Sequence, residues 1–99
     1  MQDKSTLEDA LALMHDLRAR CEWDRAQTHE SLRPYLLEET HELDDALRTG
    51  DPSAMREELG DVLLQVLFHA VLAEEAGAFD AHDVAAGLID KMRRRNPHL

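Results

Sequence analysis

Two pairs of acidic residues in the sequence have a spacing that could build a metal site. Glu39 and Glu42 are three residues apart, as are Glu58 and Asp61, and in a helix this step brings both side chains to one face. On a helical wheel, Glu39 falls inside the apolar arc of its helix and Glu42 falls at the edge of that arc. Like charges in a low dielectric either take up protons or recruit a cation. The alternative interpretation is an acidic face exposed to water.

The types of residue in this group favour a hard cation. Carboxylate oxygens without thiolates favour Mg²⁺, with Mn²⁺ as a substitute, over zinc. The six histidines form no zinc-type pair with the single cysteine, Cys21, and each alone is expected at the surface or in packing. His41 and His69 come nearest the acids, and we expect them at most to support a ligand.

A run of cations near the end of the chain suggests an anionic ligand. Four of the eleven Lys and Arg residues fall together, namely Lys91, Arg93, Arg94 and Arg95. Cations stabilise a helix C-terminus, which is one explanation. The other is a clamp for a polyanion that carries Mg²⁺, such as a nucleoside triphosphate. Trp23, in a polar segment, is either a hydrophobic plug or a platform on which a base stacks.

The elements that must position these residues are predicted to be four helices. Apolar residues repeat at helical spacing, and no segment alternates as a strand would. Ser5 and Glu8 have the form of a capping box, and residues 21–28 break the helical period and are predicted to form a loop. The predicted helices span about 6–20, about 32–49, about 52–76 and about 80–96. We therefore predict an all-α fold, a four-helix bundle by architecture.

The third predicted helix also indicates whether the chain associates with a second copy. Its apolar residues cover nearly the whole circumference and leave one polar slice, made by Glu58, Asp61, Gln65 and His69. A helix that is apolar on almost every side must be surrounded, and three neighbours in a chain of 99 residues are too few. We expect a homodimer formed through this helix, and the sequence leaves open whether dimers pair further.

Length, charge and composition argue against several classes of function, among them binding to nucleic-acid polymers and insertion into membranes. The length suits a single all-α domain, residues 1–99. Eleven basic against 21 acidic residues give a formal charge of −10, which would repel nucleic-acid polymers and anionic membranes. No apolar run is long enough to span a membrane, the first residues lack the apolar core of a signal peptide, and one cysteine permits no internal disulfide. We expect a cytoplasmic protein.

Several motifs together resemble those of the MazG-type nucleoside triphosphate pyrophosphohydrolases, closest to the amino-terminal module of the two-module bacterial proteins. The resemblance covers nearly the whole chain, although Glu22 and Asn96 depart from the usual proline and histidine. The matching segments are Trp23-Asp24-x-x-Gln27-Thr28-His29, Ser31-Leu32-Arg33-Pro34-Tyr35-Leu36-Leu37-Glu38-Glu39-x-x-Glu42, Arg56-Glu57-Glu58-Leu59-Gly60-Asp61 and Lys91-Met92-x-Arg94-Arg95-x-Pro97-His98.

The resemblance implies a dimeric all-α fold, with pockets built partly from both subunits. It also implies Mg²⁺-dependent hydrolysis of (d)NTP to (d)NMP and pyrophosphate, in a house-cleaning role for the nucleotide pool. The implied metal ligands are Glu39, Glu42, Glu58 and Asp61, and the implied catalytic acids are Glu38, which binds a further ion or orients the attacking water, and Glu39. The implied substrate-binding residues are Trp23 at the base and Lys91, Arg94 and Arg95 at the phosphates.

Two other functions remain open at this point. In some two-module relatives one module is catalytically silent, so the chain could be a metal- or nucleotide-binding dimerisation or regulatory module. The third interpretation is a purely structural bundle whose acids are exposed.

Overall fold

The computed structural model describes residues 5–98, which form five helices. Four of them match the predicted helices, and the all-α class is confirmed. The fifth is a single turn within the predicted loop around Trp23, so the loop prediction was wrong for those four residues. In chain order the helices are α1 (Leu7–Arg20), α2 (Glu22–Arg25), α3 (His29–Thr49), α4 (Pro52–Glu75) and α5 (Ala81–Arg95).

Side chains at the helix ends explain where the helices begin. The capping box of α1 is made by Thr6 and Asp9, one residue later than the predicted Ser5–Glu8 pair. Thr6 is the residue whose backbone is extended, and only from there can its hydroxyl accept a hydrogen bond from the N–H of Asp9. Similar boxes start α3 and α5, formed by Thr28 with Ser31 and by Asp80 with Asp83.

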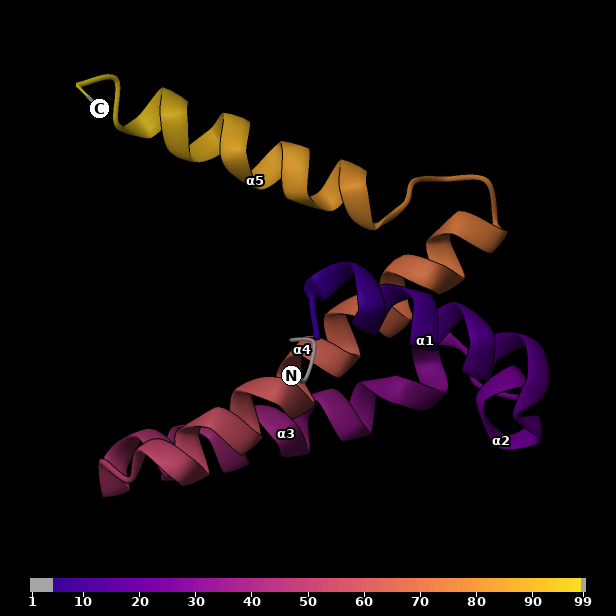
Figure 1. The fold of residues 1–99 in the computed structure, drawn as a ribbon, viewed down its shortest axis with the longest axis horizontal. Coiled ribbons are helices and arrows are strands. Elements are labelled where there is room, and N and C mark those ends of the chain that lie inside the picture. The colour runs from indigo at the N-terminus through magenta and orange to yellow at the C-terminus, as the bar shows by residue number, and fades with distance from the viewer. Residues whose placement is uncertain (1–4, 99) are drawn as a thin grey trace.

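The turn between α3 and α4 makes these two helices neighbours. Gly50 adopts a left-handed backbone with φ of 71°, which ends α3, and Asp51 caps α4 with Pro52 at its first position. Because the turn is so short, α4 folds back along α3, and the two helices run side by side in Figure 1. This pairing places the acids of one helix opposite those of the other.

The core lies where α1 and α3 meet the second half of α4. Its buried apolar side chains are Leu11 and Met14 of α1, Leu32 of α3, and Phe68, Val71 and Leu72 of α4. Other parts of α4 are covered less: Leu59 in its first half and Val66 just beyond its middle are about half exposed. One chain therefore leaves part of the apolar circumference of α4 open to solvent.

The last helix stands apart from the other long helices. Figure 1 shows α5 extending away from the body formed by α1 to α4. None of its residues is buried, although Leu88, Ile89 and Met92 are apolar. Within residues 5–98, no helix combines the length and hydropathy needed to cross a membrane.

Candidate active site

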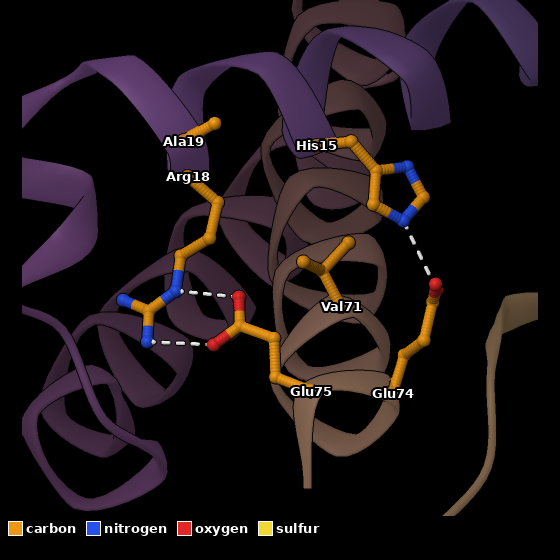
Figure 2. A pocket seen from close by; sticks show the side chains of 6 residues that line it. All are labelled: His15, Arg18, Ala19, Val71, Glu74 and Glu75. Carbon is orange, nitrogen blue, oxygen red and sulfur yellow. Dashed lines mark hydrogen bonds and ion pairs between the residues drawn. The ribbon is translucent and has the colours of Figure 1, made fainter. Parts of the chain in front are cut away.

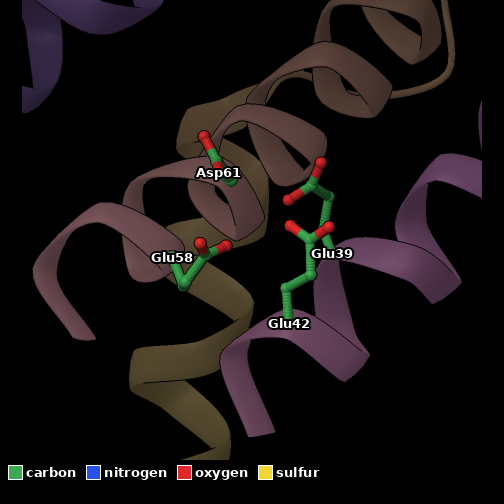
Figure 3. A group of neighbouring side chains, drawn as sticks. All are labelled: Glu39, Glu42, Glu58 and Asp61. Atoms are coloured by element: carbon green, nitrogen blue, oxygen red, sulfur yellow. The ribbon is translucent and has the colours of Figure 1, made fainter. Parts of the chain in front are cut away.

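Four carboxylates meet between α3 and α4. Glu39 and Glu42 come from α3, and Glu58 and Asp61 come from α4, each pair separated by less than one helical turn. One oxygen from each side chain lies within 4.8 Å of the other three. Figure 3 shows the two pairs pointing toward each other across the space between the helices. The convergence expected from the wheel is therefore present in a single chain.

These acids, which we call the acidic cluster, are partly withdrawn from water and lack protein counter-ions. Glu39, Glu58 and Asp61 are half-buried, whereas Glu42 is exposed and leaves one side of the cluster open. One oxygen each of Glu39 and Glu58 is buried without a hydrogen-bond partner. Among residues 5–98, no Lys, Arg or His forms an ion pair with any of the four acids.

The electrostatics of the cluster favour the uptake of positive charge. Burial raises the pKa of Glu39 above its ordinary value, and repulsion from Asp61, Glu42 and Glu58 raises it further. Burial is also the main reason why the pKa of Glu58 is raised, with repulsion from Glu42 and Asp61 adding to it. A bound cation would remove this repulsion and give the unpartnered oxygens a partner.

The donor set fits a hard divalent cation. All four side chains offer carboxylate oxygens, which Mg²⁺ and Mn²⁺ prefer, and no thiolate or imidazole is among them. The open side at Glu42 leaves room for water or an anionic ligand to complete the coordination, as Mg²⁺ usually requires.

The other predicted site residues lie outside the acidic cluster. Glu38 is exposed on α3, next to Glu39 in sequence. The predicted phosphate-binding residues Lys91, Arg94 and Arg95 are exposed on α5, and Arg94 pairs with Asp90 at 3.0 Å. Because α5 stands apart, one chain does not bring these cations to the acids.

Trp23 lies on α2, and 52% of its surface is exposed. Its ring meets the ring of Tyr35 on α3 edge to face, with 6.1 Å between the centroids. So large an exposed fraction disfavours the hydrophobic-plug interpretation and leaves the indole accessible to a ligand.

Sequence reasoning missed the residue that holds the Trp23 segment in place. Arg18 of α1 forms two parallel bonds with Glu75 of α4, from Nε at 2.8 Å and from Nη2 at 3.1 Å, as Figure 2 shows. Its Nη1 donates to three carbonyl oxygens that follow Trp23, those of Asp24, Arg25 and Gln27, at 2.6, 2.7 and 3.1 Å. An arginine in a predicted helix carries no local signal of such contacts, because Glu75 is 57 residues away.

His41 and His69 are the two histidines predicted to come nearest the acids, and neither belongs to the group of four side chains. His41 is exposed, and the ring of His69 stacks instead on the ring of His29, with 2.7 Å between their Nδ1 atoms. Burial, and then the nearby His29, lower the pKa of His69. The pairing was not predicted because it depends on the register of α3 against α4.

Comparison with known proteins identifies the family. Residues 27–99 match the family model described as the MazG nucleotide pyrophosphohydrolase domain, and the chain belongs to this family. It is 53% identical over 94 residues to the nucleoside triphosphate pyrophosphohydrolase/pyrophosphatase MazG of Thermotoga maritima, covering 93% of this chain and 37% of that protein. It is 55% identical over 98 residues to a nucleoside triphosphate pyrophosphohydrolase of Mycolicibacterium smegmatis, covering 97% of this chain and 30% of that protein.

The fold is similar to a solved member of the same group. The crystal structure of a mazG-related protein from Thermotoga maritima superposes with a TM-score of 0.79 at 25% identity, covering 92% of this chain and 80% of that chain. The nucleoside triphosphate pyrophosphohydrolase of Escherichia coli is 44% identical over 96 residues, 94% of this chain and 36% of that protein. This chain thus spans about a third of the length of these curated relatives.

Proposed function

We propose that the chain is a nucleoside triphosphate pyrophosphohydrolase that depends on Mg²⁺, or on Mn²⁺ in its place, and cleaves (d)NTP to (d)NMP and pyrophosphate. The observation that carries the proposal is the acidic cluster, in which two helices bring four carboxylates together and no basic side chain of residues 5–98 pairs with them. Family membership and the names of the relatives support it independently. Clearance of unwanted nucleotides from the pool is the role that we propose for this activity.

We propose the following roles for the acidic residues. Glu39, Glu42, Glu58 and Asp61 would hold the divalent ions, which lower the pKa of bound water and neutralise charge on a triphosphate. Glu38, which is exposed on α3 and next to Glu39 in sequence, would orient the attacking water and accept its proton.

The substrate would be held from two other parts of the chain. Trp23 and Tyr35 offer an exposed aromatic corner on which a base could stack. Lys91, Arg94 and Arg95 would contact the phosphates. These cations lie on α5, away from the cluster of their own chain, so we propose that they act on the site of a second copy.

A homodimer would also cover the apolar surface that one chain leaves open. Leu59 and Val66 of α4 are about half exposed, and no residue of α5 is buried. An apolar hollow of about 320 Å³ lies between α1, α4 and α5. Sedimentation analysis of the purified chain tests this: a monomer at micromolar concentration would contradict it.

The reaction itself is tested with purified protein, Mg²⁺ and a panel of canonical and oxidised nucleoside triphosphates. Products are separated and counted as monophosphate, diphosphate, pyrophosphate and orthophosphate. Cleavage at the α-phosphorus gives pyrophosphate and monophosphate in equal amounts, whereas orthophosphate without pyrophosphate would eliminate the proposed reaction. The panel also measures base and sugar preference, on which the acidic cluster has no bearing.

One observation favours a second candidate function. Because the chain spans about a third of its relatives, the activity in their names can belong to another part of those proteins. The candidate is a catalytically silent module that binds metal and nucleotide and supports dimerisation or regulation. Calorimetry that finds nucleotide binding, together with no product over hours with Mg²⁺ or Mn²⁺, would favour this function.

A further inference from the structure

Buried polar atoms without a partner are concentrated on one stripe of the molecule. Within residues 5–98, the buried side-chain nitrogen and oxygen atoms that lack a hydrogen bond belong to Glu39 of α3 and to Glu58, Gln65 and His69 of α4. Leaving such an atom unpaired costs about 1–3 kcal/mol. Their location along a single helix pair points to a ligand that supplies partners there.

Gln65 is the most deeply buried of these residues. Its side chain is only 5% exposed, and it is the one polar residue in the buried class among the described residues. Its Oε1 is the unpartnered atom. An amide carbonyl is acceptor-only, so the missing partner must be a hydrogen-bond donor or a cation.

The position of Gln65 on α4 brings it next to the acidic cluster. It follows Asp61 by four residues, and side chains four apart on a helix are neighbours, about 5–6 Å between Cβ atoms. Asp61 on one side and His69 on the other both meet α3, through Glu39 and His29 respectively. Gln65 lies between them on the same stripe, so its side chain also faces α3.

We propose that Gln65 is a positioning residue of the metal centre, whose Oε1 accepts a hydrogen bond from water bound to the divalent ion. This inference rests on the proposed function, because it presumes an ion at the acidic cluster. Mg²⁺ keeps several of its waters in protein sites, and each such water is a strong donor. A neutral amide can hold that water without adding to the repulsion among the four carboxylates.

The competing explanation lies within the chain itself. Gln65 and His69 are also four residues apart, and both present an unpartnered buried atom. If these two side chains partner each other rather than a ligand, Gln65 serves packing alone. The experiment must therefore separate metal binding from stability.

The test measures binding of Mn²⁺ and Mg²⁺ to the full chain by calorimetry, without nucleotide. Gln65→Met keeps the length of the side chain and removes the acceptor, and we expect about tenfold weaker binding, as is typical when an outer partner of a metal site is lost. Melting of the metal-free variant is expected to match the wild type or exceed it. The relaxivity of the Mn²⁺ complex, which reports exchange of bound water, is expected to change.

Two further variants make the result decisive. Gln27→Met is the matched control, since Gln27 bonds the carbonyl oxygen of Trp23 away from the cluster, and its Mn²⁺ affinity and relaxivity should equal those of the wild type. Gln65→Asn keeps the amide but withdraws it by one methylene, so it should also weaken binding. It serves as the second variant if Gln65→Met does not fold.

Unchanged affinity in either Gln65 variant overturns the inference. So does weaker binding with unchanged relaxivity, because that is a packing effect transmitted from His69. A wild-type chain that binds neither Mn²⁺ nor Mg²⁺ removes the metal centre of the proposed function, and this inference with it. A failure of the inference alone is recognised by wild-type binding that the Gln65 variants retain.

Discussion

The two ends of α4 use their acids in opposite ways. Near its C-terminal end, Glu75 accepts hydrogen bonds from Nε and Nη2 of Arg18, and Glu74 meets His15 at 3.0 Å (Figure 2). In the first half of the helix, Glu58 and Asp61 meet two more carboxylates (Figure 3), and no basic side chain in the described part of the chain pairs with them. At one end of the helix the acids pair with basic side chains of the same chain, and at the other end the acids gather where a bound cation would relieve their repulsion.

The two ends of α4 therefore contribute differently: the paired acids stabilise the fold, and the clustered acids are the ones for which we propose a function. A paired carboxylate beside a half-buried arginine fixes α1 to α4 and, through three carbonyls, fixes the Trp23 segment. An unpaired cluster weakens the fold, because each carboxylate repels its neighbours. A fold that tolerates such a cluster sacrifices stability where we propose that a cation binds.

The largest effect is expected from Glu39→Gln, measured as the rate of pyrophosphate release. The change removes ligand charge but little volume, so activity should fall on the order of a hundredfold to a thousandfold, as when one electrostatic contact in an active site is lost. Metal-free stability should hold or rise, because repulsion within the acidic cluster decreases. Urea unfolding checks this second part.

The matched control for that prediction is Glu74→Gln at the other end of α4. It makes the same chemical change where the carboxylate has a partner, so activity should stay within a few-fold of wild type. Full activity in Glu39→Gln, or equal losses in both variants, would contradict the contrast between the two ends.

The next largest effect is expected on stability, from Arg18→Met. The variant leaves Glu75 and three carbonyl oxygens without their donor, and bonds to a charged group contribute about 1.5–3 kcal/mol. We expect the free energy of unfolding in urea to fall by about 2–3 kcal/mol. Fluorescence of Trp23 should report greater solvent exposure, since its segment loses its anchor.

Arg20→Met provides the comparison for Arg18. Arg20 also pairs with a carboxylate, that of Asp16 at 2.6 Å, but its side chain is 76% exposed. Exposed pairs of this kind contribute about 0–1 kcal/mol. If the two arginine variants are equally unstable, the buried position of Arg18 is not what matters.

Addition or removal of Mg²⁺ should change the free energy of unfolding only through the acidic cluster. A ligand that binds only the folded state raises the free energy of unfolding by roughly 1.4 kcal/mol at ten times its Kd. We expect this increment in the wild type, its loss on addition of EDTA, and a much smaller increment in Glu39→Gln. Thermal unfolding with and without Mg²⁺ measures all three, and stability that ignores Mg²⁺ would favour a purely structural bundle.

The metal-free protein should also respond to pH through Glu39. Its pKa in the folded chain is raised above 4.5, so the folded state holds this proton more tightly than the unfolded state does. Its contribution to stability is full below pH 4.5 and is lost as the pH rises through the raised pKa. Relative to Glu39→Gln, the wild type should lose stability as the pH rises from 4.5, and Mg²⁺ should restore it.

Much of this arrangement could be predicted from local sequence, and the exceptions share a cause. Helix periodicity and the phase of Glu39 against the leucines of α3 predict that the acids of two helices face each other, because a short turn at Gly50 leaves no other packing. The contacts of Arg18 with Glu75 and of His29 with His69 could not be predicted, since each joins residues 40 or more positions apart. The exposed position of α5 depends on tertiary packing, which the pattern within the helix does not encode.

The smallest effect is expected at the histidine pair, where the sign of the pH response is reversed. The pKa of His69 is lowered below 6.5, so its contribution to stability is full above pH 6.5 and is lost as the pH falls through the lowered pKa. His69→Phe keeps a stacked ring that does not titrate. Urea midpoints from pH 7.5 down to about 5 should therefore fall more steeply for the wild type than for this variant.

The control for this pair is His41→Gln, since His41 is exposed on α3 and should leave the slope unchanged. A parallel pH dependence in the wild type and in His69→Phe would show that the stacked ring takes up its proton as readily in the folded chain as in the unfolded one. If the two slopes differ as expected, the acids and the histidine on one face of α4 have opposite effects on the stability of the metal-free fold. The acids would lower it as the pH rises and His69 would lower it as the pH falls, and Mg²⁺ would restore only the loss caused by the acids.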